Sequence, residues 1–298
     1  FLRYIDPNND ETFCDPKLAE HWLPVDLYMG GPEHAVGHLM YSRIWNKYLY
    51  DKGLSPVKEP FKKLVHQGMI LGSNGIKMGK RFPEFVVNPS DVVEEYGADT
   101  LRLYEMFMGP LEVSKPWNDN NVQGAKRFIT RVWNFFTNPD NIVEESGGAL
   151  EKVYHQTVKK VTNDFEQLGF NTAISQMMIF VNEVYKVGKC PKEYAEGLIK
   201  MFSCICPHVS EEIWQRMGHD DTIAFEKWPE FDESKIVEDT VEIAVQINGK
   251  TRAVVTVPAD VTKEDAIAAG KAVIADKLTG TIVKEIYVPC RIVNIVQK

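Results

Sequence analysis

The chain has 298 residues, of which 44% are hydrophobic and 26% are charged, a balance typical of folded domains rather than of disordered segments. A net charge of −8 argues against a protein that coats nucleic acid by bulk charge, because phosphate binding favours a basic footprint. No apolar run approaches the roughly 20 residues that cross a membrane, and no cationic leader precedes an apolar stretch. The five cysteines are scattered and odd in number. We therefore expect a cytoplasmic protein with reduced thiols.

Residues 1–117 are predicted to form an α/β domain, because strand-like apolar runs alternate there with Gly/Pro punctuation. The pattern predicts a strand over residues 25–29, which ends at Gly30-Gly31, and a helix over residues 34–50. That helix would carry on one face the apolar residues Leu39, Met40, Ile44 and Tyr48. A second strand is predicted over residues 64–71, and it leads into a loop rich in Gly and Lys.

Residues 118–232 are predicted to form a helix bundle, since apolar residues recur there at three- and four-residue spacing.

Residues 233–298 have a different pattern, in which two strands of alternating apolar and polar residues flank Asn248-Gly249, a pair that favours a tight hairpin turn. The elements expected in this small ββαββ module are Val241–Ile247, Thr251–Val257, a helix from Thr262 to about Thr279, Val283–Val288 and Arg291–Val296.

The loop at residues 75–81 places three cations, Lys77, Lys80 and Arg81, among glycines that let the backbone flex. Ammonium groups in such a loop can approach a polyphosphate, and without that partner the cluster repels itself. Short basic runs are common, so a solvated surface loop is an equal alternative on these residues alone.

The turn Gly30-Gly31-Pro32-Glu33-His34 follows the first predicted strand, at the end where α/β sheets bind nucleotides. Its glycines would admit an adenine or a ribose close to the backbone. The Glu33 carboxylate could accept hydrogen bonds from both ribose hydroxyls. The alternatives are that Glu33 is a helix N-terminal carboxylate favoured by the helix dipole, and that His34 is a structural histidine.

The run from Val25 to Arg43, which contains this turn, resembles the leucyl-tRNA synthetases, whereas valine and isoleucine enzymes carry different residues at the turn. The resemblance continues in the same order through Gln67–Met69, Lys77–Arg81, Val87–Pro89, Tyr96–Arg102, Gly109–Glu112, Ser114–Trp117, Phe170–Ser175, Pro207–Trp214 and Trp228-Pro229. The ending, with Val245–Lys250 and Ile286–Pro289, resembles the C-terminal domain of the bacterial enzymes. Essentially the whole chain is covered.

This resemblance implies three domains. Residues 1–117 would be the second half of a class I Rossmann-type catalytic domain, residues 118–232 an all-α anticodon-binding-type bundle, and residues 233–298 a small α+β tRNA-binding domain. The implied activity is ATP-dependent activation of leucine to leucyl-adenylate and transfer of the leucyl group to tRNA(Leu). Mg²⁺ would enter with ATP, and no metal bound by the protein itself is expected.

The resemblance also assigns roles by position in the motifs. Lys80 corresponds to the second lysine of the KMSKS motif and would meet the ATP phosphates, while Lys77 corresponds to the first and would help to hold the loop. The other residues of the implied ATP and adenylate site are Gly30, Gly31, Glu33, His34, Gln67 and Met78.

Three features depart from the family pattern. Gly79 and Arg81 stand where the motif has serines, and the segment after the loop is one residue longer than usual. The small domain that many bacterial leucine enzymes insert before this loop is absent. The HIGH motif and the editing domain would precede Phe1, so we expect a fragment that is inactive without the missing N-terminal half of the same polypeptide. His38, in a run that superficially imitates HIGH, is interpreted as structural.

Candidate tRNA contacts are local basic residues. These are Lys126, Arg127 and Arg131, expected on one face of the bundle, and Lys250, Arg252 and Lys284 in the last module. For any single one of them, an exposed residue that contacts only solvent is an equally good interpretation.

The altered loop also leaves open a stand-alone tRNA-binding module derived from a synthetase, and a valine or isoleucine synthetase is a further alternative. A HIGH motif and an editing domain upstream of Phe1 would separate the enzyme from the binding module.

Overall fold

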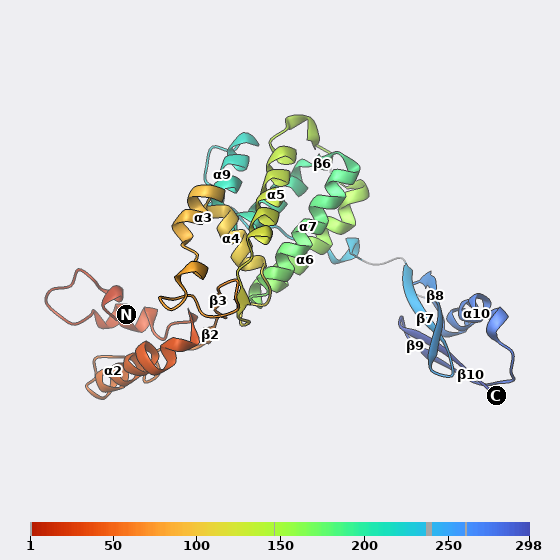
Figure 1. Cartoon of the computed structure of the whole chain (residues 1–298), viewed down its shortest axis with the longest axis horizontal. Helices are drawn as coiled ribbons and strands as arrows, with labels where there is room; N and C mark the ends of the chain where they lie inside the picture. Colours follow the sequence, from red (N-terminus) through yellow and green to blue (C-terminus); the bar gives the residue numbers. More distant parts are fainter. Residues whose placement is uncertain (1, 146, 237–239, 260) are drawn as a thin grey trace. The chain divides into compact units, whose positions relative to one another are not determined.

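The computed structural model describes residues 2–145, 147–236, 240–259 and 261–298, and it divides into two compact units, Phe1–Phe231 and Asp232–Lys298 (Figure 1). Within these described residues, no helix is long and apolar enough to cross a membrane. The first unit combines short parallel strand pairs with a helix bundle, and the second is a four-stranded sheet with one helix. The predicted order of an α/β segment, an all-α segment and a small α+β module is confirmed.

The first unit begins with the short helices η1 (Leu2–Ile5) and α1 (Pro16–Trp22). A two-stranded parallel sheet of β1 (Tyr28–Gly30) and β2 (Leu64–His66) follows them. Between the two strands the chain forms a 3-10 turn at Pro32–His34, a π-helical turn at Ala35–Leu39 and helix α2 (Met40–Asp51). The first strand is shorter than predicted, since Val25 makes only an isolated bridge to Phe61.

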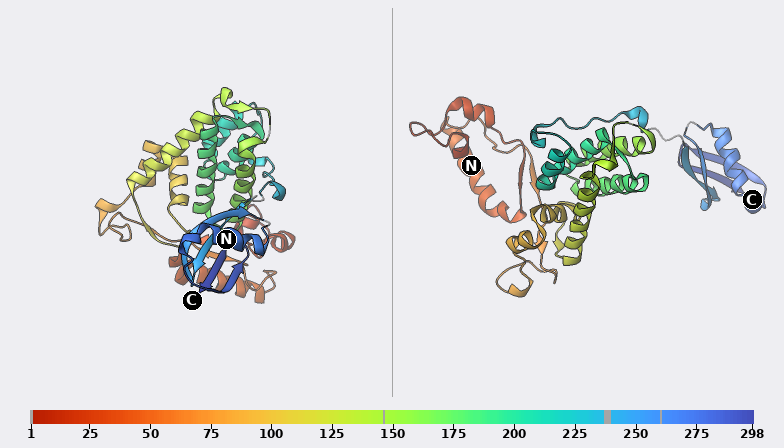
Figure 2. Two further views of the ribbon diagram at one scale, coloured as in Figure 1. Left: turned by 90° about the vertical axis from the view of Figure 1, so that its right-hand side faces the viewer. Right: turned by 90° about the horizontal axis from the view of Figure 1, so that it is seen from above.

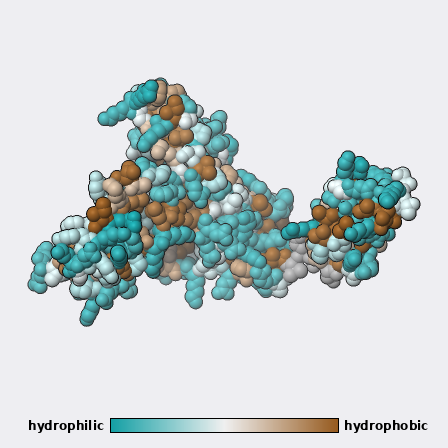
Figure 3. Space-filling view, turned by 90° about the horizontal axis from the view of Figure 1, so that it is seen from below, coloured by the Kyte–Doolittle hydropathy of each residue, from teal (hydrophilic) through white to brown (hydrophobic). Residues whose placement is uncertain are grey.

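Helix α2 buries two polar side chains and one leucine, and it exposes most of its large apolar side chains. Ser42, Asn46 and Leu49 are buried, and the Asn46 amide donates to Val57 O at 2.8 Å. The exposed apolar stripe consists of Met40, Tyr41, Ile44, Trp45 and Tyr48, which are 43–66% exposed. Figure 3 shows apolar patches among the hydrophilic surface. Met40, Ile44 and Tyr48 share a face as predicted, but Leu39 is buried away from it, because a step of one residue turns a helix by about 100°.

The second predicted strand is split in two. β2 ends at His66, and β3 (Ile70–Leu71) pairs instead with β4 (Lys115–Pro116). The break occurs because Gly68 N donates to Leu111 O at 2.7 Å, which directs the chain toward a distant segment. A Cβ at Gly68 would collide with the backbone of Val113, so this approach requires glycine. The prediction of one continuous strand over residues 64–71 is therefore wrong.

Two short helices connect the strands to the bundle. The side chain of Asn88 caps α3 (Pro89–Tyr96), and Gly97, at φ 92°, separates it from α4 (Ala98–Phe107). The bundle itself, seen from two further directions in Figure 2, contains α5 (Asp119–Phe136), α6 (Glu151–Glu166), α7 (Phe170–Val187), α8 (Lys192–Ser203) and α9 (Pro207–Arg216). Short strands β5 (Ile142–Val143) and β6 (Cys190–Pro191) pair beside it.

One hydrophobic core runs from Val92 to Ile223 and includes residues on both sides of Trp117. Tyr104 of α4 packs edge-on against Trp117 at 4.8 Å between ring centroids, and its hydroxyl accepts a hydrogen bond from Asn118 N at 2.9 Å. The core therefore continues across the expected boundary between residues 117 and 118, and that boundary stays a prediction.

Helix α4 holds the turn between α8 and α9. The buried carboxylate of Asp99 accepts hydrogen bonds from Val209 N at 2.7 Å and from His208 Nδ1 at 2.8 Å, at the start of α9. Arg102 donates to Ile205 O at 2.8 Å and to Cys204 O at 3.2 Å, just after α8 ends. A helix start lacks acceptors for its N–H groups and a helix end lacks donors for its carbonyls, so these two side chains complete both termini.

The second unit has the predicted ββαββ order. β7 (Thr240–Ile247) and β8 (Lys250–Pro258) form a hairpin whose turn residues Asn248 and Gly249 have φ values of 50° and 80°. Helix α10 (Lys263–Val273), capped by Thr262, precedes β9 (Ile282–Val288) and β10 (Ile292–Gln297). The strand order is β8-β7-β10-β9, and a single core joins the sheet to α10.

We expect Asp99→Ala to lower the free energy of unfolding of the first unit by about 2 kcal/mol, because the start of α9 loses a buried charged acceptor. All six tryptophans lie in this unit, so urea denaturation followed by tryptophan fluorescence measures it directly. Asp221→Ala is the control. Asp221 is exposed and has no hydrogen bond or ion pair with any described residue. Equal midpoints for the two variants would contradict the capping role.

Candidate active site

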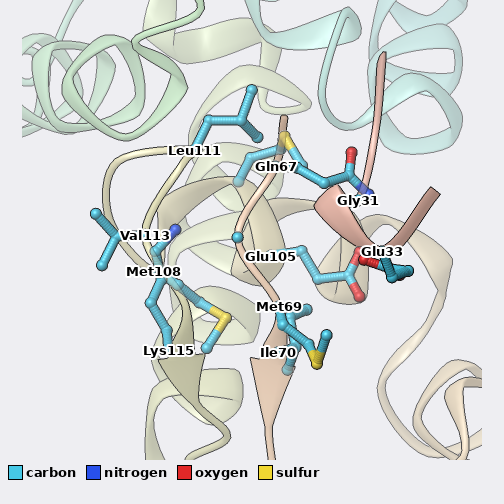
Figure 4. A pocket seen from close by; sticks show the side chains of 12 residues that line it. Gly31, Glu33, Gln67, Met69, Ile70, Glu105, Met108, Leu111, Val113 and Lys115 are labelled. Atoms are coloured by element: carbon cyan, nitrogen blue, oxygen red, sulfur yellow. The ribbon is translucent and has the colours of Figure 1, made fainter. Parts of the chain in front are cut away.

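The candidate site lies at the carboxyl ends of the parallel strands β1 and β2. Gly30 ends β1 and Gly31 follows it, Gln67 follows β2, and Gln67 N approaches Gly30 O at 3.4 Å. Because parallel strands end at the same edge, residues distant in sequence meet there. The predicted residues Gly31, Glu33 and Gln67 line one cavity of about 360 Å³ (Figure 4), which we call the glycine-turn cavity.

Gly31 allows the position that the Glu33 side chain takes in this structure. A Cβ at residue 31 would come closer to the Glu33 carboxylate than any real contact allows, so a side chain here would push that carboxylate away from the turn. With glycine, the carboxylate folds over the turn and faces the cavity. Glu33 lies in a 3-10 turn rather than in the first turn of an α-helix. Among the described residues, its carboxylate accepts no hydrogen bond from a backbone N–H group of that turn. This geometry favours a binding role for Glu33 over the helix-terminus reading.

Two further charged residues of this cavity were not identified from the sequence: Glu105 of α4 and Lys115 of β4. Burial raises the pKa of the Glu105 carboxyl above its ordinary value, and Arg102 opposes that shift only in part. Burial lowers the pKa of Lys115, whose ammonium group donates to Gly109 O at 3.0 Å. In Figure 4 the Glu105 side chain points toward the Glu33 side of the cavity. Glu105 lies in an apolar helical run, and its sequence position gives no signal of the cavity.

A second cavity, of about 290 Å³, lies beside the same turn and is lined by Gly30, Gly31, His34 and His38, with Tyr28 and Leu39. We call it the histidine cavity. The Tyr28 hydroxyl and His38 Nε2 form a short hydrogen bond. The π-helical turn at Ala35–Leu39 contains Gly37 with non-helical angles, and such turns often occur at functional sites. His38, interpreted from the sequence as structural, therefore has a structural partner and also faces a cavity.

The basic loop is anchored on both sides and projects between its anchors. Gly72 N donates to Ile76 O at 2.8 Å, and Leu71 bridges to Lys77. Met78 turns inward, packs against the main core and accepts a hydrogen bond from Val87 N through its sulfur at 3.4 Å. Lys77 and Lys80 are exposed and line neither cavity. Met78 thus acts as an anchor of the loop in this structure and does not line the cavity as a binding residue.

The candidate RNA-contacting residues of the bundle do not share one face. Arg127 and Arg131 face a cavity between α4, α5 and α7. Lys126 faces a different cleft, and its ammonium group donates to Tyr96 O at 3.0 Å. The prediction of a common face is wrong for Lys126, because adjacent helical residues point about 100° apart whereas residues four apart align.

In the second unit the three basic candidates lie on two different strands. Lys250 and Arg252 belong to β8 and Lys284 to β9, and these strands form the opposite edges of the sheet. Neighbouring strands lie about 4.8 Å apart, so three strand spacings, roughly 14 Å, separate the two edges. On β9, Tyr287 packs toward the core and Glu285 pairs with Lys271 of α10, so by alternation Lys284 points to the face of the sheet away from α10. On β8, the pairing shifts register between Val245–Ala253 and Gln246–Thr251, so Arg252 is the extra residue of a β-bulge, where alternation assigns no face.

No group of three or more His, Cys, Asp or Glu side chains among the residues described is placed to hold a metal ion. The five cysteines are free thiols; Cys190 and Cys206 are buried, and burial raises the pKa of Cys190 to about 12.

Two protein-family models match the chain. Residues 13–113 match the tRNA synthetases of class I (I, L, M and V), and residues 149–267 match the anticodon-binding domain of tRNA ligases. Both candidate cavities involve residues of the first match.

Solved structures give the same result. A leucyl-tRNA synthetase from Agrobacterium radiobacter K84, solved in a ternary complex with tRNA and LeuAMS, is 31% identical with a TM-score of 0.80, and the alignment covers 100% of this chain and 40% of that enzyme. A methionyl-tRNA synthetase from Mycobacterium tuberculosis, solved with methionyl-adenylate, is 17% identical with a TM-score of 0.52, covers 67% of this chain and 45% of that enzyme, and supports the fold alone. The chain thus spans less than half the length of either enzyme.

Glu105→Gln should stabilise the first unit at pH 7. The pKa of Glu105 is higher in the folded state than its ordinary value of 4.5, so at pH values above 4.5 the ionised carboxylate disfavours folding. The neutral amide of glutamine does not ionise and removes that penalty. Below pH 4 both folded and unfolded states of the parent protonate this group, and the difference should disappear. Urea midpoints of the two proteins between pH 4 and pH 8 measure this; a stabilisation independent of pH would contradict the burial of the charge.

Proposed function

We propose that this chain, which belongs to the class I tRNA synthetases that include the isoleucine, leucine, methionine and valine enzymes, is part of a leucine–tRNA ligase. The observation that carries the proposal is the meeting of Gly31, Glu33 and Gln67 in one cavity at the carboxyl ends of β1 and β2, followed along the chain by the anchored basic loop. The 31% identity to a leucyl-tRNA synthetase over the whole chain supports leucine as the amino acid.

The proposed reaction has two steps. In the first, the leucine carboxylate attacks the α-phosphorus of ATP, the new P–O bond forms leucyl-adenylate, and pyrophosphate leaves. In the second, a hydroxyl of the terminal adenosine of tRNA attacks the leucyl carbonyl, and AMP leaves. Mg²⁺ enters with ATP and screens its phosphate charge. Both steps depend mainly on positioning and on stabilisation of developing negative charge.

The residues of this chain would divide that work. Glu33 would accept hydrogen bonds from the ribose hydroxyls, and Gly31 would let the nucleotide approach the backbone. Lys80 would reach the departing pyrophosphate from the exposed end of the loop, while Lys77 and the inward Met78 hold the base of the loop. The histidine cavity, with apolar walls from Met29, Leu39 and Leu64, suits an aliphatic amino-acid side chain beside the adenylate.

We also propose that the catalytic unit is completed by a further part of the same fold. Parallel sheets are normally covered on both faces and contain more than two strands, whereas β1 and β2 form an isolated parallel pair among the described residues. The exposed apolar stripe of α2 lies next to this pair in the sequence and needs cover. The 40% coverage of the leucyl-tRNA synthetase agrees with a missing portion. The stand-alone tRNA-binding module remains the alternative, favoured by the altered residues Gly79 and Arg81.

Lys80→Ala in the complete enzyme should lower leucine-dependent ATP–pyrophosphate exchange by roughly 100- to 1,000-fold, because a charge that acts mainly in the transition state is lost. Lys227→Ala, which removes an exposed lysine of the bundle, is the control and should retain the parental rate. Parental exchange by the Lys80 variant would overturn the assignment of the loop. Valine-dependent rather than leucine-dependent exchange would overturn the amino-acid assignment.

The 298-residue chain alone should show no leucine-dependent exchange, and addition of a polypeptide that carries the HIGH-motif half should restore it. Ile44→Glu, at a position that is 60% exposed, should leave the chain folded but block this restoration, because a charge would be buried in the new contact. Leu54→Glu, at an apolar residue that is 53% exposed outside the α2 stripe, is the control. Exchange by the chain alone, or restoration by the Ile44 variant, would contradict the proposal.

A further inference from the structure

We propose that the cavity between α4, α5 and α7 binds one unstacked nucleotide of an RNA chain. This cavity, which we call the bundle cavity, has a volume of about 630 Å³ and lies outside the glycine-turn and histidine cavities. Its size falls within the range of small-molecule sites. The inference rests on the proposed tRNA ligase function and deepens it, since it gives the bundle a defined contact with RNA.

One wall of the bundle cavity is apolar and partly aromatic. Phe107, the last residue of α4, is 38% exposed although it is a large apolar side chain, and it faces the cavity together with the half-buried Met178 of α7. A nucleobase stacks on an exposed aromatic ring irrespective of its sequence, and such stacking is a main source of affinity for unpaired nucleotides. The wall therefore suits a flat, apolar-faced ligand.

The cavity is also lined by two arginines four residues apart on α5, Arg127 and Arg131. Arg131 is fixed in place. Its guanidinium donates to Asn182 Oδ1 at 2.9 Å and lies 4.6 Å from the centroid of the Tyr185 ring, while the Tyr185 hydroxyl donates to Arg131 O at 2.8 Å. These contacts leave other guanidinium N–H groups available for a phosphate, which arginine binds with two donors at once. In a chain of net charge −8, such a local pair is where an RNA backbone would be attracted.

The first turn of α5 adds unpaired amides. The side chains of Asn120 and Asn121 both line the cavity, and neither amide makes a hydrogen bond to another group in the parts of the chain that the structure describes. A side-chain amide offers both donors and an acceptor, which matches the edge of a base. The aromatic ring can thus stack on the face of a base, the arginines can bind the phosphate, and the amides can form hydrogen bonds with the edge of the base.

Gly124 supplies an independent reason to expect a ligand. It lies within α5, where glycine is unfavourable compared with alanine, and it lines the cavity. Its backbone needs no positive φ, and a Cβ would meet only the Arg127 guanidinium, at an ordinary 3.7 Å. Nothing in the described fold therefore requires glycine at this position. Its effect is to keep one side of the cavity open for something that approaches the helix backbone.

The test measures binding of deacylated leucine tRNA to the 298-residue chain at two salt concentrations. Gly124→Leu should fill the cavity and weaken tRNA binding roughly ten-fold or more, and Phe107→Ala should weaken it similarly by removal of the stacking surface. Arg127→Ala should weaken binding and lower the slope of log affinity against log salt by about one. Thermal unfolding of each variant checks the fold, and Gly124→Ala, which fits the backbone, should be at least as stable as the parent.

Lys227→Ala is the control for Arg127→Ala, because it removes one positive charge from an exposed residue of the same unit that lines none of the cavities described above. Its tRNA affinity should stay within about two-fold of the parental value. Parental tRNA binding by a folded Gly124→Leu variant would overturn the proposal, as would equal losses for Lys227→Ala and Arg127→Ala. Saturable binding of AMP alone, abolished by Gly124→Leu without any effect on tRNA, would assign the cavity to a free nucleotide and also overturn it. The leucine ligase proposal fails separately, if the complete enzyme shows no leucine-dependent exchange in an assay without RNA.

Discussion

Asp99 and Arg102 hold one turn of the bundle from both sides, and the first unit is organised around the helix that carries them. From α4, the Asp99 carboxylate completes the start of α9 and the Arg102 guanidinium completes the end of α8. The same helix contributes Glu105 to the glycine-turn cavity and Phe107 to the bundle cavity. Because a ten-residue helix is a rigid rod of about 15 Å, these groups keep fixed positions relative to one another. A displacement of α4 would therefore change its contacts with the α8–α9 turn and move a wall of each cavity together.

A second constraint comes from the unfinished sheet. A buried parallel sheet needs apolar cover on both faces, yet α2 places Ser42 and Asn46 inward and its apolar stripe outward. The inward amide of Asn46 is fully satisfied by Val57, Lys58 and Ser55, so this orientation is stable within the chain. The apolar stripe then remains as the surface that a further layer of the same fold would cover. Under our proposal, that layer would also enclose Glu33 and His34, which lie just before α2.

The sequence predicts the parts of the fold that local patterns determine. The spacing of apolar residues predicts the helices of the bundle, and Asn248-Gly249 predicts the hairpin, because both follow from local backbone geometry. It predicts less well where a distant contact decides the outcome. The break at Gly68 depends on Leu111, and the division of Lys126 from Arg127 depends on which helices flank α5.

The same limit applies to the candidate site. Glycines and a carboxylate after a predicted strand identify Gly31 and Glu33, since the chemistry and the position coincide in one short motif. Glu105 and Lys115 reach the same cavity from positions 72 and 82 residues beyond Glu33, and no spacing rule connects them. The orientation of α2 could not be predicted from the sequence for a related reason. The helical period separates an apolar face from a polar face, but it does not determine which of the two is buried within this chain.

The basic loop keeps Lys80 but has Gly79 and Arg81 where the motif of the resembling family has serines. The segment after the loop, one residue longer than in the resembling family, forms a 3-10 turn at Pro83–Phe85, with Phe82 N donating to Gly79 O at 3.1 Å. Arg81 lies 5.4 Å from the centroid of the Phe82 ring, which draws its charge toward that turn. Lys80 stays exposed beside Gly79. We infer that the backbone turn and the Met78 anchor restrain the loop in place of the two serine hydroxyls of the motif, and that the conformational freedom of Gly79 would let Lys80 move toward a phosphate.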